Sequence, residues 1–169
     1  MRFIIFLITY LTLSTLAFAQ DDFLAKQYFE DGDFEKAVVF YEKLVDKNPR
    51  RTEYVQQLVS CYQQLERYNE AEVFLNQRLK DRNPYPTLLI DLGYNYALQE
   101  KTELAQKNYD KALDIIDKNP NYGYALGLQF QKYNLLNMAI KAFQKSMKLN
   151  PALNFNFQLA RIYGEQGNV

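Results

Sequence analysis

Histidine and tryptophan are absent from this chain of 169 residues, and cysteine occurs once. Without histidine there is no Ser-His-Asp or Cys-His catalytic arrangement and no His-ligated zinc. A single cysteine forms no internal disulfide, no CxxC redox pair and no Cys-rich metal site. We therefore expect no cofactor and no metal. We expect Cys61 to be a small buried side chain in a core that is stabilised by packing alone.

Glycine is scarce as well, and neither sign of charge is in excess. The six glycines form no GxGxxG or GxxxxGK pattern, so no phosphate-binding loop is predicted. Lys+Arg and Asp+Glu both number 20, which gives a net charge of +0. Nucleic-acid binding needs a basic surface that displaces counterions, so nucleic acid is not an expected partner. Aromatic residues, in contrast, are abundant, since the chain has 14 Tyr and 12 Phe.

The first 19 residues, MRFIIFLITYLTLSTLAFA, have the composition of a secretory signal peptide. Arg2 precedes an apolar run, and Ala17-Phe18-Ala19 matches the small-x-small pattern of a cleavage site. A retained membrane anchor is the alternative, but a span needs about 20 apolar residues and this run is shorter. We predict cleavage after Ala19, no membrane span after cleavage, and an exported protein that is periplasmic or extracellular.

The rest of the chain repeats with a period of 34 residues. The period is carried by Leu24, Leu58, Leu92 and Leu126 and by Ala37, Ala71, Ala105 and Ala139. A compact residue follows each leucine and an aromatic residue stands four positions after it, which builds one apolar face of a helix. Each alanine opens the contact face of a second helix. Asn-Pro closes every unit, because proline disfavours helix at the preceding residue.

Two helices in each period predict a series of αα-hairpins and no strand. The expected helices are 21–31, 34–47, 52–65, 68–81, 86–99, 102–118, 121–133, 136–149 and 153–166. Gly32 stands at the first turn inside a hairpin, and its equivalents are Glu66, Glu100 and Asn134. The expected aromatic core consists of Tyr28, Tyr41, Tyr62, Tyr96, Tyr109, Phe130 and Phe143.

This spacing resembles the tetratricopeptide repeat. The third unit carries the resemblance best, through Leu92-Gly93, Tyr96, Ala105, Tyr109, Ala112 and Pro120. The family's usual tryptophan is absent, and Arg78 and Ser146 replace small apolar residues late in the second helix. The resemblance implies an all-α fold, a right-handed α-solenoid of helix-turn-helix repeats. The expected domains are a signal peptide at 1–19 and a solenoid at 20–169, with repeats at about 21–50, 51–84, 85–120 and 121–151 and a partial fifth at 152–169.

The resemblance also implies that the first helices of the repeats line a concave groove for a peptide or protein. Its positions change along the chain from charged, through amide, to aromatic and aliphatic. The predicted groove residues are Lys26, Gln56, Ser60, Gln63, Ile90, Tyr94, Tyr124, Leu128, Gln131, Phe157 and Arg161. Packing against neighbouring repeats, or against a missing C-terminal continuation, is the alternative role for the apolar ones. A clamp for a peptide carboxylate is not predicted, because only Lys26 is cationic among the matching positions.

Paired acidic residues are the remaining candidates for catalysis. Asp21-Asp22, Glu30-Asp31 and Asp110/Asp114 lie at termini, turns or outer faces among lysines. Catalytic carboxylates need burial or a like-charged neighbour in a cleft, so we interpret these as solvated ion pairs. No enzyme active site is predicted.

These observations favour a non-enzymatic protein-interaction scaffold of the cell envelope. The alternative is the extracytoplasmic sensor or regulatory region of a larger receptor or enzyme that is truncated at Val169. The fifth unit breaks off after its first helix, which carries Phe155, Phe157 and Leu159, and this favours a fragment of a longer protein. A repeat array that only drives self-assembly is a third possibility.

Overall fold

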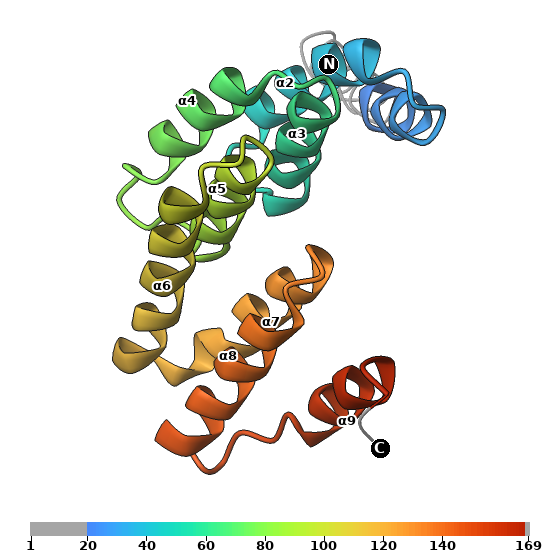
Figure 1. Cartoon of the computed structure of the whole chain (residues 1–169). Helices are drawn as coiled ribbons and strands as arrows, with labels where there is room; N and C mark the ends of the chain where they lie inside the picture. Colours follow the sequence, from blue (N-terminus) through green and yellow to red (C-terminus); the bar gives the residue numbers. More distant parts are fainter. Residues whose placement is uncertain (1–19, 168–169) are drawn as a thin grey trace, which may run out of the picture. The chain divides into compact units, whose positions relative to one another are not determined.

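The computed structural model describes residues 20–167, and these are helical with no strand (Figure 1). The predicted signal peptide at 1–19 lies outside the described residues. The chain divides into two compact units, and the division falls between Ala71 and Glu72. The described residues form helices joined by short turns in the predicted order, so the all-α repeat fold is confirmed.

The first unit contains a helix over residues 20–30, followed by α2 (Phe34–Lys47), α3 (Thr52–Gln64) and the start of α4 (Tyr68–Arg78). Helix α2 packs on α3. The core between them includes Tyr41, Leu44 and Leu58, which are at most 2% exposed. The periodic apolar face seen in the sequence is therefore the face that each helix buries.

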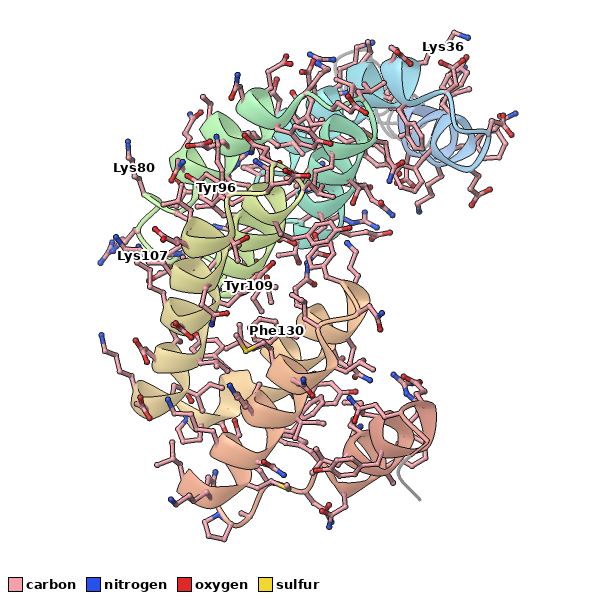
Figure 2. All side chains as sticks on the ribbon, viewed as in Figure 1. Lys36, Lys80, Tyr96, Lys107, Tyr109 and Phe130 are labelled. Atoms are coloured by element: carbon pink, nitrogen blue, oxygen red, sulfur yellow. The ribbon has the colours of Figure 1, made fainter. Side chains whose placement is uncertain are left out.

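The second unit contains the end of α4, α5 (Thr87–Ala97), α6 (Thr102–Lys118), a 3-10 turn η1 (Pro120–Tyr122), α7 (Gly123–Lys132), α8 (Leu136–Leu149) and α9 (Asn156–Glu165). Helix α5 pairs with α6 and α7 pairs with α8, as Figure 1 shows, and α9 packs on α8. Tyr109 of α6 and Phe130 of α7 join the two hairpins edge to face, with ring centroids 5.8 Å apart (Figure 2).

Three predicted helices, 34–47, 102–118 and 136–149, match the structure at both ends. Helix α4 ends at Arg78 rather than at residue 81, because the Lys80 and Asp81 amides bond to carbonyls three residues back instead of four. Helix α9 begins at Asn156 rather than at residue 153. The side chain of Asn154 accepts a hydrogen bond from the Asn156 amide, which forms a local turn immediately before the helix, and Phe155 is the N-cap residue.

The turn inside each hairpin places one residue in the left-handed region. Gly32 has φ 76°, and its equivalents Glu66, Glu100 and Asn134 have φ 56°, 60° and 56°. This conformation ends a helix and lets the next one fold back. The three non-glycine residues adopt it although an L side chain there costs about 1–2 kcal/mol, so the fold imposes the turn on them.

Glycine is needed where the two helices of a hairpin approach closely. A Cβ on Gly93 would lie 2.4 Å from the ring of Tyr109. A Cβ on Gly123 would lie 1.6 Å from Oγ of Ser146, which is fully buried. The serine that departs from the family pattern in α8 is therefore accommodated by a glycine on α7.

The predicted aromatic core is confirmed with one exception. Tyr41, Tyr62, Tyr96, Tyr109, Phe130 and Phe143 are between 0% and 8% exposed. Tyr28 is only half-buried and stacks on Phe40, with ring centroids 5.6 Å apart. Cys61 is buried, as predicted.

Candidate functional site

The predicted groove residues lie on the first helices of their hairpins but divide between the two units. Lys26, Gln56, Ser60 and Gln63 belong to the first unit, and the other seven belong to the second. The structure therefore places two separate sets of candidate residues, and each set has its own chemistry.

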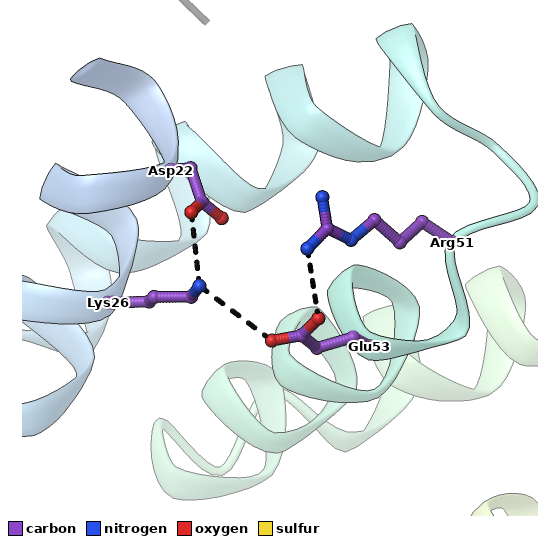
Figure 3. A network of polar contacts seen from close by, with 4 residues as sticks. All are labelled: Asp22, Lys26, Arg51 and Glu53. Carbon is purple, nitrogen blue, oxygen red and sulfur yellow. Dashed lines mark hydrogen bonds and ion pairs between the residues drawn. The ribbon is translucent and has the colours of Figure 1, made fainter. Parts of the chain in front are cut away.

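In the first unit, Lys26 is held in a network of charged side chains (Figure 3). Its Nζ lies 3.0 Å from Oδ2 of Asp22 and 3.8 Å from Oε1 of Glu53. Glu53 in turn accepts a hydrogen bond from Nη2 of Arg51 at 3.2 Å. Burial is the largest single influence on Asp22 and opposes its ionised form, but the hydrogen bonds from Lys26 and Tyr54 and the charges of Lys26 and Arg51 together outweigh it and lower the pKa of Asp22. The candidate cation of the groove is thus already paired with two carboxylates.

The uncharged polar groove residues of the first unit are partly or largely buried. Gln56 and Ser60 are half-buried, and Gln63 is 7% exposed. The buried Nε2 of Gln63 has no hydrogen-bond acceptor. An unsatisfied buried donor is unfavourable by about 1–3 kcal/mol, so this amide is available to an acceptor that reaches it.

In the second unit, three large apolar side chains are exposed on first helices. Tyr124 is 44% exposed, Leu128 is 37% exposed and Phe157 is 76% exposed. Tyr124 and Leu128 lie one turn apart on α7. The ring of Tyr124 contacts Phe155, with centroids 5.7 Å apart, which brings the start of α9 beside α7. We call Tyr124, Leu128 and Phe157 the apolar face.

Other predicted residues of this unit have different surroundings. Ile90 is fully buried, so its side chain belongs to the core. Gln131 is half-buried, and its Oε1 is buried without a hydrogen-bond donor. Arg161 is exposed and lies 3.6 Å from Glu165, one turn further along α9. Tyr94 is half-buried and stacks face to face on Tyr133, with centroids 4.0 Å apart and an angle of 13° between the rings.

The stack of Tyr94 and Tyr133 lies beside a buried acid that the sequence pattern did not reveal. Asp91 is fully buried in α5. Its Oδ1 accepts a hydrogen bond from the hydroxyl of Tyr133 at 2.6 Å and another from Nε2 of Gln129 at 2.5 Å. Its Oδ2 has no hydrogen-bond partner. The available signal was that Asp91 is the single charged residue of α5 and directly precedes the repeat leucine.

Burial dominates the acid–base chemistry of this cluster. It raises the pKa of Asp91, and the hydrogen bond from Tyr133 and the charge of Lys132 offset only part of that change. Burial and the neighbouring carboxyl of Asp91 also raise the pKa of Tyr133. Burial therefore shifts both groups toward their neutral forms, as is expected where water does not solvate a charge.

Charge is distributed unequally between the two kinds of helix in this unit. The first helices α5, α7 and α9 carry only Asp91, Lys132, Arg161 and Glu165. The second helix α6 alone carries Glu103, Lys107, Asp110, Lys111, Asp114, Asp117 and Lys118. Lys107 extends away from the ribbon in Figure 2. The face that holds the exposed aromatic side chains is thus poor in charge, whereas the second helices present a charged surface.

Three of the acidic residues considered for catalysis, Asp21, Asp22 and Asp110, have polar or cationic partners. Oδ2 of Asp21 lies 2.9 Å from Nζ of Lys47, and Oδ1 of Asp110 accepts a hydrogen bond from Gln106 at 2.9 Å. Among residues 20–167, no three potential metal ligands of the His, Cys, Asp and Glu types are grouped together. Within the same range, every helix is too short or too polar to cross a membrane.

Comparison with known proteins identifies the repeat. The family model for the tetratricopeptide repeat matches residues 28–88. The general transcriptional corepressor trfA of Dictyostelium discoideum is 24% identical over 121 residues, which are 70% of this chain and 9% of that protein. The protein O-mannosyl-transferase TMTC1 of Homo sapiens is 25% identical over 132 residues, 76% of this chain and 15% of that protein. This chain spans only a small part of either relative.

A similar fold occurs among solved structures. A tetratricopeptide repeat protein from Parabacteroides merdae aligns with a TM-score of 0.51 and 17% sequence identity, covering 90% of this chain and 61% of that one. At this identity the likeness concerns the fold, and it agrees with the helix-turn-helix repeats described above.

Proposed function

This chain is a tetratricopeptide-repeat protein, and from that premise we propose that it is a non-enzymatic scaffold of the cell envelope that holds a protein or peptide segment on the first helices of its second unit. Tetratricopeptide repeats provide a frame suited to protein interaction. The observation that carries the proposal is the apolar face, whose Phe157 is 76% exposed. Large apolar side chains exposed on helices that carry little charge are candidates for an interaction site.

Two further features support a segment of low charge as the partner. The first helices of this unit carry few charged residues, so a charged segment gains little there and loses hydration. Gln131 holds a buried acceptor without a donor, which the backbone amide of a bound segment would satisfy. Tyrosine, moreover, is enriched at the energetic centres of interfaces.

Site-specific photocrosslinking tests this proposal. A photoreactive phenylalanine analogue is placed at Leu128 or Phe157, and the protein is irradiated in envelope extract. Leu104 is the matched control, since it is an apolar residue 42% exposed on the second helix α6. We expect one protein to be crosslinked from Leu128 and Phe157 and not from Leu104.

Two charge substitutions, one on the apolar face and one on α6, complete the experiment. Leu128→Glu introduces a charge into the apolar face, and Leu104→Glu introduces the same charge on α6. Loss of the crosslink from Phe157 with Leu128→Glu alone is the expected result. Equal crosslinking from all three positions, or equal loss with both substitutions, would show that the apolar face is not the binding surface.

Export is a separate part of the proposal and rests on the sequence of residues 1–19. We expect the secreted protein to begin at Gln20. N-terminal sequencing of protein recovered from the envelope tests this, and a chain that begins at Met1 would contradict cleavage.

A further inference from the structure

Asp91 occupies the place where α5 meets α7, because its hydrogen-bond donors both come from the end of α7. It is fully buried, and a single oxygen accepts both bonds. Tyr133, one of these donors, uses the rest of its side chain to stack on Tyr94. Contacts therefore connect the buried carboxyl of Asp91, through the ring of Tyr133, to the half-buried ring of Tyr94 at a predicted groove position.

We propose that Asp91 is a positioning residue for the binding surface. Its hydrogen bond holds the ring of Tyr133 in the orientation in which Tyr133 stacks on Tyr94. The inference rests on the proposed function, because Tyr94 is a predicted groove residue. A ring held by a hydroxyl bond at one end and a parallel stack along its face has little freedom to rotate. A partner then meets a surface that is already shaped, and the entropy lost on binding is smaller.

The role of Asp91 as a hydrogen-bond acceptor can be tested separately from its ability to ionise. Two donors need one acceptor atom, and an asparagine in place of Asp91 supplies it through its own carbonyl. The unpartnered Oδ2 is not needed for this role. The charged and titratable groups that act on Asp91 are Lys132, the last residue of α7, and Tyr133, which follows it. Tyr94, on the helix of Asp91, acts on Tyr133. Positioning should therefore survive replacement of the carboxyl by an amide and fail when the acceptor or the hydroxyl is removed.

A measurement without any ligand tests the positioning itself. In the full chain with carbon-13-labelled tyrosine, the ring protons of Tyr94 should resonate upfield, because the Tyr133 ring lies 4.0 Å away. We expect Asp91→Asn to retain this shift, and Asp91→Leu and Tyr133→Phe to reduce it by at least half. Tyr122→Phe is the matched control, since Tyr122 is an exposed tyrosine on η1. An unchanged shift in Tyr133→Phe would overturn the proposal.

A second measurement connects the stack to binding. The probe is a peptide selected from a random phage-displayed library for binding to the full chain and for sensitivity to Leu128→Glu. We expect Tyr133→Phe and Asp91→Leu to weaken its binding roughly fivefold, the effect of one buried hydrogen bond, and Asp91→Asn to change it less than twofold.

The outcomes separate the two proposals. If no selected peptide is sensitive to Leu128→Glu, the proposed function fails, and the tyrosine resonances still decide whether Asp91 orients the stack. If the peptide binds but ignores Asp91→Leu and Tyr133→Phe, positioning is wrong and the binding surface stands. Asp91→Leu leaves the donors of Gln129 and Tyr133 without an acceptor, which is unfavourable. Denaturant unfolding therefore accompanies the binding measurement, and Tyr133→Phe, which leaves Asp91 the donor of Gln129, decides the outcome if Asp91→Leu does not fold.

Discussion

Gly127 of α7 packs directly against the ring of Phe143 of α8, so that a Cβ on this glycine would lie 2.3 Å from the ring. Phe143 is fully buried and cannot swing aside. The same relationship joins Gly93 and Tyr109 one repeat earlier. The two helices of each hairpin can therefore approach this closely because glycine has no side chain. The same close approach occurs in both repeats.

Gly127→Ala should lower the free energy of unfolding by about 2 kcal/mol, since overpacking of a tight core typically costs 1–3 kcal/mol. Denaturant unfolding followed by circular dichroism measures the change. Gly164→Ala is the matched control, because Gly164 lies in α9 with nothing within 4 Å of a Cβ. That substitution should be neutral or stabilising. Equal effects of the two changes would contradict the close packing.

Glu100→Gly should raise the free energy of unfolding by about 0.5–1 kcal/mol. Glu100 has φ 60°, which glycine adopts without the strain of a side chain, although glycine also loses more chain entropy on folding. The reciprocal change, Gly32→Ala, should be destabilising, because φ is 76° there while the space around a Cβ is open. Thermal unfolding of both variants checks the pair, and the idea fails if both shifts have the same sign.

Asp91→Asn should stabilise the protein near pH 7 and change little near pH 4. Burial raises the folded-state pKa of Asp91 above the value of about 3.9 in an unfolded chain. The unfolded state then releases its proton first, so the stability contributed by the neutral carboxyl is full at low pH and is lost as pH rises toward the folded-state pKa. Asparagine has no such proton. A difference in denaturation midpoints that does not grow with pH would contradict this.

Cys61 should resist thiol reagents in the native protein. Its side chain is fully buried, and burial raises the pKa of the thiol to about 12, which suppresses the reactive thiolate. Because Cys61 is the one cysteine of the chain, absorbance of released thionitrobenzoate reports its modification alone. We expect labelling only after denaturant unfolds the first unit. Rapid labelling without denaturant would show that this core opens readily.

Most of the fold could be predicted from the spacing of residues, because equivalent positions of the repeats carry the same residue types and pack in the same way. Leu58 and Leu126 recur in phase and are both buried. Helix ends were harder to predict, since a local turn such as the one made by the Asn156 amide and the Asn154 side chain moves the start of a helix without changing its apolar pattern. The cluster at Asp91 was missed because its donors, Gln129 and Tyr133, lie about 40 residues further along the chain.

The repeating hairpins follow from the sequence, since a helix must bury its apolar stripe and the 34-residue period gives the position of each stripe. The exposure of each groove position follows from the packing of the folded chain. Ile90, Tyr124 and Phe157 stand two residues before the repeat leucine in successive repeats, yet they are 0%, 44% and 76% exposed. Exposure depends on the side chains that neighbouring helices bring to a position, and the local pattern of one repeat does not contain that information.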